Sequence, residues 1–316
     1  MRRRIVLALA ALTLWVAGTV AGSIGPAAPT PAAAQPMLVI GKAHAGFTPQ
    51  LTGDKPIFIL ALGSDARPGT PIDHGLSDSI HIIAINPDKE RVSILGFPRD
   101  SYVPIPGHGS NKINAAMPLG GPQLTIQTVE DITGIRFDYY VLTSFEGVQT
   151  AVDDIGGLTI DVPFPMFDSY SRSNFDPGVQ TLNGHDVLAF ARDRHSLASG
   201  DFGRSEDQGR VLLAALTQLR KQYAKDPSVL FDYMGAGLRN IQTDLSTPEV
   251  LDFAFTALAI NPAHVQNMVA PGSIGSVGTL STVNLLSSNS AIYKDLADDG
   301  IVSKKNVPPS PTANQG

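Results

Sequence analysis

The stretch that decides the fold is IFILALGSDAR at residues 57–67, followed by LSDSIHIIAINP at residues 76–87 and RVSILGFPRDSYV at residues 91–103. Each segment contains a short run of β-branched or alternating apolar residues, which has the length and composition of a strand. We therefore predict strands at about residues 57–62, 80–85 and 92–97.

Charged residues border each of these predicted strands. Asp65 and Arg67 follow the first strand, Asp78 precedes the second, and Arg99 and Asp100 follow the third. Because adjacent strands lie about 5 Å apart, two carboxylates and an arginine can meet at one edge of the sheet. Two carboxylates and a guanidinium group are what a metal-bound phosphate requires.

The composition limits the classes of partner. The sequence has 316 residues, a formal net charge of −6 and no cysteine, which excludes disulfides and thiolate chemistry. The first 34 residues contain three arginines and no acidic residue, so the remainder is more acidic than the whole. Phosphate affinity depends on a basic face, so we expect no nucleic-acid partner, and any anion site must be local.

The N-terminal segment has the pattern of a targeting sequence. Three arginines at residues 2–4 precede an uncharged, mostly apolar run at residues 5–21, typical of either a signal peptide or a membrane anchor with a cytoplasmic N-terminus. The segment AAPTPAAAQ at residues 27–35 suits cleavage after Ala34 and equally suits a flexible spacer. We expect a signal or anchor at residues 1–22, an Ala/Pro/Gly-rich linker at 23–55, an extracytoplasmic domain at 56–300 and a disordered tail at 301–316.

Beyond residue 103, predicted helices and strands alternate. Strands are expected at residues 139–142, 158–162 and 265–270, and helices at residues 145–155, 185–191 and 204–223. Ser110 or Asn111 is expected to cap a helix that reaches residue 132 with an interruption at Gly120 and Gly121, and a capping box at Ser246 opens a helix to residue 259. Residues 163–181 are predicted to be irregular. This alternation predicts an α/β sheet protein.

Taken one at a time, the charged residues have ordinary explanations. Asp65 and Asp78 suit turns or caps at strand ends, and Arg99 suits a surface ion pair. Arg192 and Arg194 suit a solvated helix end, where cations interact favourably with the helix dipole. These charged residues also fall within a series of sequence blocks, so we interpret them together and not one at a time.

These blocks resemble one known family. In order along residues 62–208 they are LGSDAR, SDSI, GFPRDSYVPIPG, NKINAA, VEDITGI, FEGV, DDIGGLTIDVP, LNGHDVLAFARDR and GDFGRSEDQ. Together they resemble the LytR-CpsA-Psr family of cell-wall glycopolymer ligases, and the resemblance covers roughly residues 56–219. It implies a single α-β-α sandwich-like domain, in which helices flank a central mixed sheet and enclose an apolar pocket for a lipid.

The resemblance also implies an activity. Members of the family transfer a glycopolymer, with its linking phosphate, from a polyprenyl-pyrophosphate lipid to a peptidoglycan hydroxyl, releasing polyprenyl phosphate. We therefore expect a Mg²⁺-dependent phosphotransferase (with Mn²⁺ as a substitute) at the extracytoplasmic face of the bacterial membrane. Its expected partners are the polyprenyl-pyrophosphate-linked glycan, the peptidoglycan acceptor and the membrane.

The resemblance assigns roles to matching residues. Asp65 and Asp78 would hold Mg²⁺, and with Arg99, Arg192 and Arg194 they would form the catalytic set. The residues expected around the pyrophosphate are Arg99, Arg192, Arg194, Arg204 and Gln208, with Arg67, Lys112 and Asn114 as weaker candidates. A base for the acceptor hydroxyl could be Asp65 or Asp78, and the sequence does not choose.

Several questions stay open at this point. Leu76 stands where the family often has a basic residue, which removes one positive charge near the expected pyrophosphate. The apolar faces at residues 187–190 and 211–219 could line the lipid pocket or simply pack in the core. Water in place of the sugar hydroxyl would give a polyprenyl-pyrophosphate hydrolase, and a non-catalytic wall- or lipid-binding regulatory protein is the remaining alternative.

Overall fold

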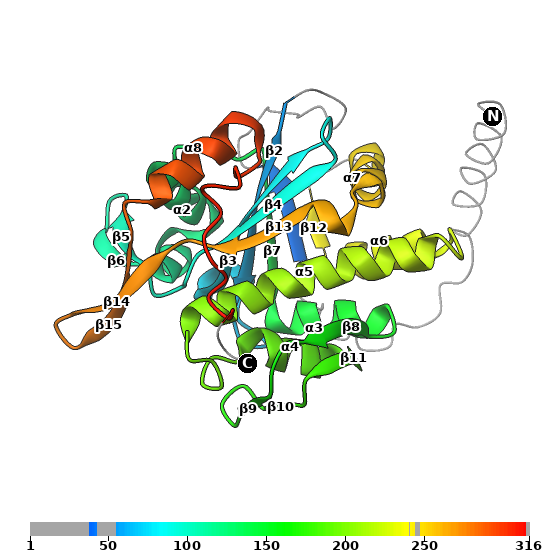
Figure 1. Ribbon diagram of the computed structural model, residues 1–316, viewed down its shortest axis with the longest axis horizontal. Helices are drawn as coiled ribbons and strands as arrows, with labels where there is room; N and C mark the ends of the chain where they lie inside the picture. The colour runs from blue at the N-terminus through cyan, green and yellow to red at the C-terminus, as the bar shows by residue number, and fades with distance from the viewer. Residues whose placement is uncertain (1–37, 43–54, 240, 244–246, 314–316) are drawn as a thin grey trace, which may run out of the picture. The chain divides into compact units, whose positions relative to one another are not determined.

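A mixed seven-stranded sheet forms the centre of the part of the chain that the structure describes (Figure 1). The structure is a computed structural model, and it describes residues 38–42, 55–239, 241–243 and 247–313. The strand order is β12–β1–β7–β2–β3–β4–β13. These strands are β1 (Leu38–Lys42), β2 (Ile57–Ser64), β3 (Ser77–Asn86), β4 (Arg91–Gly96), β7 (Tyr139–Ser144), β12 (Ile241–Thr243) and β13 (Val265–Val269).

The three strands that the opening stretch predicts are confirmed as neighbours. β2 pairs antiparallel with β3, and β3 pairs antiparallel with β4, so the chain forms a meander at the middle of the sheet. β7 joins β2 in parallel and β13 joins β4 in parallel, which makes the sheet mixed. The antiparallel connections place the end of β2, the start of β3 and the end of β4 at the same edge.

Helices cover both faces of the sheet, as the α/β interpretation predicts. Phe58, Leu60 and Leu62 of β2 pack in one cluster with residues of α2 (Ala116–Thr133) and α8 (Asn289–Asp299). Ile57 and Ile59 point to the opposite face and pack in a second cluster with residues of α5 (Asp201–Tyr223) and α7 (Thr247–Ala259). Alternate side chains of a strand point to opposite faces, so β2 is buried on both sides. Each fully buried Leu or Ile contributes about 1.5–3 kcal/mol.

A smaller layer extends the domain beneath α5 (Figure 1). Its elements are α3 (Phe145–Asp154), β8 (Leu158–Val162), β9 (Met166–Asp168), β10 (Ser173–Phe175), β11 (Gly178–Leu182) and α4 (Gly184–Arg192). Side-chain caps set the helix starts, because Ser144 accepts a hydrogen bond from Gly147 N and Asn183 accepts one from Asp186 N. The apolar faces predicted at residues 187–190 and 211–219 meet here, where Val187 and Phe190 pack with Val211.

The remaining elements are shorter. They are the 3-10 turns η1 (Ile72–His74), η2 (Ile113–Ala115) and η3 (Pro262–His264), the hairpin strands β5 (Tyr102–Ile105) and β6 (Gly109–Lys112), helix α6 (Val229–Leu238) and the hairpin strands β14 (Gly272–Val277) and β15 (Leu280–Leu285). No helix among the described residues is both long and apolar enough to span a membrane. The expected signal or anchor at residues 1–22 and the cap at Ser246 lie outside the described residues.

The structure corrects the prediction for residues 110–132. Ser110 and Asn111 do not cap a helix but lie in β6, which pairs with β5. Gly107 and Gly109 adopt positive φ in the connecting turn, so the PIPGHG segment closes a hairpin instead of leading into a helix. The helix starts after η2 at Ala116, and it is kinked at the predicted glycine pair.

Three further predictions about irregular segments are wrong. Leu38–Lys42, within the expected linker, is strand β1 and pairs with β7 and β12. Residues 163–181 contain three short strands, in which the buried side chains of Met166 and Phe175 anchor the pairing. The expected disordered tail is ordered up to residue 313, because Thr312 is buried and its hydroxyl donates to Glu206 Oε2 at 2.7 Å.

Candidate active site

The sheet edge at the end of β2, the start of β3 and the end of β4 carries the predicted charged residues. Ser64 pairs with Ser77, so Asp65 and Asp78 lie on adjacent strands at this edge. Arg99 follows β4 and its Nη1 donates to Asp78 Oδ2 at 2.5 Å. Both side chains are largely buried, with 21% of Arg99 and 10% of Asp78 exposed. The predicted meeting of a carboxylate and an arginine at this edge is confirmed.

Backbone hydrogen bonds hold Asp65 beside the start of β3. Asp65 Oδ1 accepts from Leu76 N at 2.7 Å, and Asp65 N donates to Leu76 O at 3.0 Å. The Leu76 side chain supplies no charge, but its main chain fixes the direction of the Asp65 carboxylate.

The first two turns of α5 bring three more polar side chains to the same edge. Arg204 is 5% exposed at its side chain, and its Nη2 lies 2.5 Å from Asp201 Oδ1. Arg99 Nε lies 4.0 Å from the same oxygen, so Asp201 bridges two arginines. Gln208 Nε2 donates to Asp78 O at 3.3 Å and to Ala191 O at 3.2 Å, which ties α5 to β3 and to α4.

Asp201 is a site residue that the sequence prediction missed. Its position three residues before Arg204 on one helix face was the available signal, because residues at this spacing are neighbours on a helix. Its second contact, with Arg99, depends on how α5 lies on the sheet, which the sequence pattern does not contain.

Two glycines and a buried histidine allow α5 to lie this close to the sheet. A Cβ atom at Gly96 of β4 would lie 2.3 Å from Ser205 Oγ, and one at Gly209 of α5 would lie 2.0 Å from Asn267 Oδ1. His81 of β3 fills the space beside Gly96, where its Nε2–H donates to Ser205 O at 3.0 Å. Burial lowers the pKa of His81 to about 4, so the ring is neutral and keeps this hydrogen bond at physiological pH.

The end of α4 supplies two further predicted arginines. The guanidinium group of Arg192 lies over the ring of Phe145, 4.7 Å from its centroid, which is the geometry of a cation–π contact. Burial lowers the pKa of Arg192, and the charges of Asp78, Arg67, Arg99 and Asp65 also act on it. Arg192 is thus within electrostatic reach of both aspartates and of Arg99 at the sheet edge, and of exposed Arg67.

The arginines of this cluster lie close enough to lower one another's pKa. Burial lowers the pKa of Arg204; Asp201 raises it, while the positive charges of Arg99 and Arg194 lower it further. Burial also acts to lower the pKa of Arg99, but the hydrogen bond and charge of Asp78 outweigh it and the net pKa is raised. Guanidinium groups stay charged in proteins, and five arginines act together here with four aspartates in a chain whose net charge is −6. The arginines are Arg67, Arg99, Arg192, Arg194 and Arg204, and the aspartates are Asp65, Asp78, Asp100 and Asp201. The local charge is positive.

Lys112 and Asn114 support the loop that carries Arg99. Lys112 Nζ forms an ion pair with Asp100 Oδ1 at 2.7 Å, and Asn114 N donates to Arg99 O at 3.3 Å. Asn114 is 5% exposed. The structure therefore places these two weaker candidates in contact with the backbone and side chains of the loop that carries Arg99.

A buried carboxylate oxygen that has no partner within the described chain lies at this edge and suits a hard cation. Asp78 Oδ1 is buried and has no hydrogen-bond partner among the described residues, and Asp65 lies on the adjacent strand end. No group of three or more His, Cys, Asp or Glu side chains that could hold a metal ion occurs in the described part of the chain. Two carboxylates suit Mg²⁺, which keeps several waters and takes its remaining ligands from substrate phosphates.

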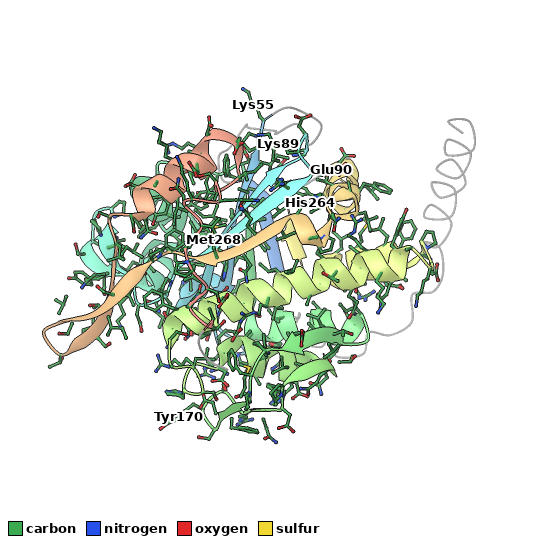
Figure 2. All side chains as sticks on the ribbon, in the orientation of Figure 1. Lys55, Lys89, Glu90, Tyr170, His264 and Met268 are labelled. Atoms are coloured by element: carbon green, nitrogen blue, oxygen red, sulfur yellow. The ribbon has the colours of Figure 1, made fainter. Side chains whose placement is uncertain are left out.

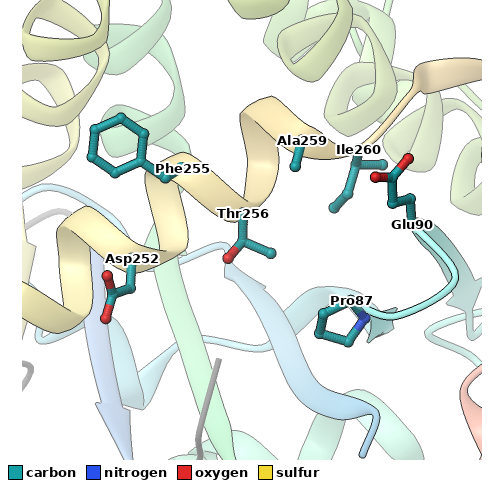
Figure 3. Close-up of a pocket in the computed structure, with 7 residues that line it drawn as sticks. All are labelled: Pro87, Glu90, Asp252, Phe255, Thr256, Ala259 and Ile260. Atoms are coloured by element: carbon teal, nitrogen blue, oxygen red, sulfur yellow. The ribbon is translucent and has the colours of Figure 1, made fainter. Parts of the chain in front are cut away.

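A pocket far from these charges is shown in Figure 3. It has a volume of about 330 Å³ and lies between α7 and the β3–β4 turn, with Phe255 and Ile260 on one side and Pro87 on the other. This turn is at the opposite end of β3 from Asp78, so the pocket does not contribute to the charged edge. The apolar lipid pocket remains a prediction, because the two faces proposed for it pack together in the core.

Comparisons with known proteins agree with this arrangement. The chain is 38% identical over 234 residues to the polyisoprenyl-teichoic acid–peptidoglycan teichoic acid transferase TagU of Oceanobacillus iheyensis, which covers 72% of this chain and 68% of that protein. It is 36% identical over 158 residues to TagU of Bacillus subtilis and spans about half the length of that relative.

A solved structure and a family profile complete the comparison. The crystal structure of B. subtilis TagV superposes with a TM-score of 0.65 at 28% identity, covering 82% of this chain and all of that one. The profile of the LytR_cpsA_psr family matches residues 34–297, which is most of the sequence. This protein therefore belongs to the LytR_cpsA_psr family.

Proposed function

We propose that this protein transfers a glycopolymer from a polyprenyl-pyrophosphate carrier to peptidoglycan through a phosphodiester link. The observation that carries the proposal is the convergence of Arg99, Arg192 and Arg204 with Asp65 and Asp78 at one sheet edge. A locally positive site in an acidic chain suits a pyrophosphate and not a polyanionic nucleic acid. The related TagU proteins are named as teichoic acid transferases that use peptidoglycan, which supports the same class of donor and acceptor.

The reaction balances without an oxidant or a further co-substrate. The oxygen of the peptidoglycan hydroxyl attacks the phosphorus atom that carries the glycan, and a new P–O bond forms. The bond from this phosphorus to the bridging oxygen breaks, and the bridging oxygen leaves with polyprenyl phosphate. The hydroxyl proton is released to solvent. The glycan keeps one phosphate, which becomes the phosphodiester.

The arginines contribute charge neutralisation and positioning. Negative charge moves toward the bridging oxygen as the bond breaks, and guanidinium groups bind phosphate oxygens in a bidentate fork. Arg204 and Arg99 are held in place by Asp201, so they need little rearrangement when the substrate binds. We assign the pyrophosphate to Arg99, Arg192, Arg194 and Arg204, with Arg67 at the exposed rim.

Asp65 and Asp78 are the residues that would hold Mg²⁺. The bound ion would neutralise phosphate charge and orient the pyrophosphate oxygens. Asp78 is already hydrogen-bonded to Arg99 through Oδ2, so its unpartnered Oδ1 is the atom available to a cation. Mn²⁺, which also prefers oxygen ligands, would substitute.

The chemistry sets the location. A polyprenyl lipid and peptidoglycan meet at the outer face of the cell membrane, so we infer an extracytoplasmic catalytic domain. The arginine-led apolar segment at the N-terminus supports a signal or anchor that brings the domain to this surface.

The test is turnover of a synthetic polyprenyl-pyrophosphate glycan with soluble peptidoglycan fragments, with and without Mg²⁺. Wild type, Arg99→Ala and Asp78→Ala are compared, with the exposed Arg239→Ala as a control far from the site. We expect a phosphodiester-linked product by mass spectrometry, reduced about 10²–10³-fold in the two site variants, which is typical for loss of one charge-stabilising group. Free glycan phosphate alone would indicate the hydrolase, and binding without turnover would indicate the regulatory protein.

A further inference from the structure

A second cavity borders the charged cluster on the side of Arg194 and Asp201. It has a volume of about 260 Å³ and lies between the α4–α5 connection, the start of α5 and the β14–β15 hairpin. The hairpin is joined to the site, because Val283 N of β15 donates to Asp100 O at 2.8 Å, directly after Arg99 in the chain. A ligand in this cavity would therefore lie next to the pyrophosphate assigned above.

The lining of this cavity has the mixed chemistry that a sugar ring requires. It combines side chains able to exchange hydrogen bonds with hydroxyl groups, namely Asp100, Arg194, Ser199 and Ser281, with the aromatic ring of Phe202. A pyranose presents hydroxyl groups at its edge and apolar C–H groups on its faces. Binding sites for such ligands place a few polar groups against an aromatic or apolar wall.

An exposed aromatic pair stands at the rim. His195 lines the cavity, and Tyr170 stacks against it with a centroid distance of 4.7 Å. Tyr170 is 79% exposed and projects from the β9–β10 end of the molecule in Figure 2. The outer face of its ring is open to solvent and its position is defined by the stack.

The histidine of this pair is fixed from behind. His195 Nδ1 lies 2.9 Å from Asp168 Oδ2, and Asp168 is 4% exposed. Burial acts to raise the pKa of Asp168, but hydrogen bonds with His195 and from Tyr170 N outweigh it, and the net pKa is lowered. The carboxylate is thus charged at neutral pH and orients the imidazole ring. The rim is preorganised, which reduces the entropy lost on binding a ligand.

We propose that this cavity, with Tyr170 and His195 at its rim, binds the acceptor saccharide of peptidoglycan. The proposal rests on the transferase function above. In-line displacement at phosphorus requires the attacking hydroxyl to enter opposite the leaving polyprenyl phosphate. The cavity gives the acceptor a place of its own beside the pyrophosphate site, and Arg194, which lines the cavity and belongs to the arginines assigned to the pyrophosphate, connects the two. The donor glycan also contains sugars, so the test must separate the two.

The experiment measures KM for the acceptor and KM for the donor separately in Tyr170→Ala and Tyr170→Phe. We expect a three- to tenfold rise in acceptor KM for Tyr170→Ala, the size of one lost aromatic contact, with kcat and donor KM unchanged. Tyr170→Phe keeps the ring and should keep the wild-type acceptor KM. Phe255→Ala, an exposed aromatic at the distant pocket of Figure 3, is the matched control.

Either alternative result would overturn the proposal. A rise in donor KM alone would assign the cavity to the donor glycan, and unchanged acceptor KM would remove it from saccharide binding. If wild type shows no turnover, the transferase function fails, and the cavity is then tested by direct titration of soluble peptidoglycan saccharides. Weaker binding by Tyr170→Ala than by wild type would support a saccharide site, and equal binding would refute it.

Discussion

Replacing Asp201 with asparagine tests the buried charge arrangement at the centre of the site. The variant keeps the shape of the side chain but removes the charge that Arg204 meets at 2.5 Å. At an effective dielectric constant of about 20, two unit charges at this distance attract by roughly 7 kcal/mol. The charge of Asp78 still acts on Arg204, and the asparagine carbonyl still presents a partial negative charge, so only part of this energy is lost.

The expected loss of stability is about 3 kcal/mol, because removal of one partner from a buried pair typically costs 3–5 kcal/mol. Arg99 also loses a contact, but it keeps its hydrogen bond to Asp78 and adds little. For a domain of this size the melting temperature should fall by about 6–12 °C. Urea unfolding monitored by circular dichroism measures the free energy directly. Inorganic pyrophosphate should stabilise the variant more than wild type, since binding replaces the missing negative charge.

Asp154→Asn is the matched control. Asp154 also pairs with an arginine, but the pair is at the surface, with 29% of Asp154 and 63% of Arg239 exposed. Its loss should cost no more than about 1 kcal/mol. If Asp201→Asn changed the unfolding free energy by as little as the control, the Asp201–Arg204 pair would not be the buried, unscreened interaction described here.

Three other perturbations follow from the same geometry. Gly96→Ala should lower the free energy of unfolding in urea by about 1–3 kcal/mol and should also lower turnover, because the new Cβ would lie 2.3 Å from Ser205 Oγ and push α5 outward. Unchanged unfolding and turnover would contradict the close approach of α5 to the sheet. The pKa of His81 is lowered from 6.5 to about 4, so the stability that neutral His81 contributes is complete above pH 6.5 and is lost as pH falls through 4. In unfolding curves measured in parallel, His81→Gln should lack this loss between pH 6.5 and 4. The same acid dependence in both proteins would refute the buried, neutral histidine. Burial raises the pKa of Asp207 from 3.8 to about 7, so wild type loses stability as pH rises through 7. The unfolding free energy of Asp207→Asn should therefore increase relative to that of wild type from about pH 4 to pH 8. A constant difference between the two free energies would refute the burial penalty.

The central part of the fold was predictable because the sequence signals there are local. The runs at residues 57–62, 80–85 and 92–97 are long and apolar enough to specify buried strands, and only a short turn separates the second run from the third. A short turn favours an antiparallel pair, which places Asp78 and Arg99 at one edge. The longer connection at residues 65–76 leaves the direction of the first strand open, so the place of Asp65 at this edge depends on how that strand pairs.

The missed elements depend on distant contacts. Leu38–Lys42 has a β-forming sequence but lies in an Ala/Pro/Gly-rich region, and it is a strand only because β7 and β12 offer it partners. The C-terminal segment has no periodicity, yet Ser310 and Thr312 donate to Glu206 on α5, more than a hundred residues away. Local propensity carries no information on such pairings.

The site was predicted in outline and not in its supporting contacts. Arg192, Arg194 and Arg204 lie on different elements, and the family resemblance identified them without showing what holds them. The structure adds Asp201 between Arg99 and Arg204 and places Lys112 on Asp100 instead of in the cluster. The pair between Arg99 and Asp201 joins α5 to the end of β4, so it depends on the close approach of α5 to Gly96.

The most direct test of the proposed activity follows the bridging oxygen of the pyrophosphate. A donor lipid labelled with ¹⁸O at this position is incubated with wild type, Mg²⁺ and peptidoglycan fragments, and the products are weighed by mass spectrometry. Attack at the glycan-bearing phosphorus predicts that the label leaves entirely with polyprenyl phosphate, while the peptidoglycan product carries an unlabelled phosphodiester. Label in the peptidoglycan product, or a product without phosphate, would place the cleavage at another bond and contradict the phosphotransferase assignment.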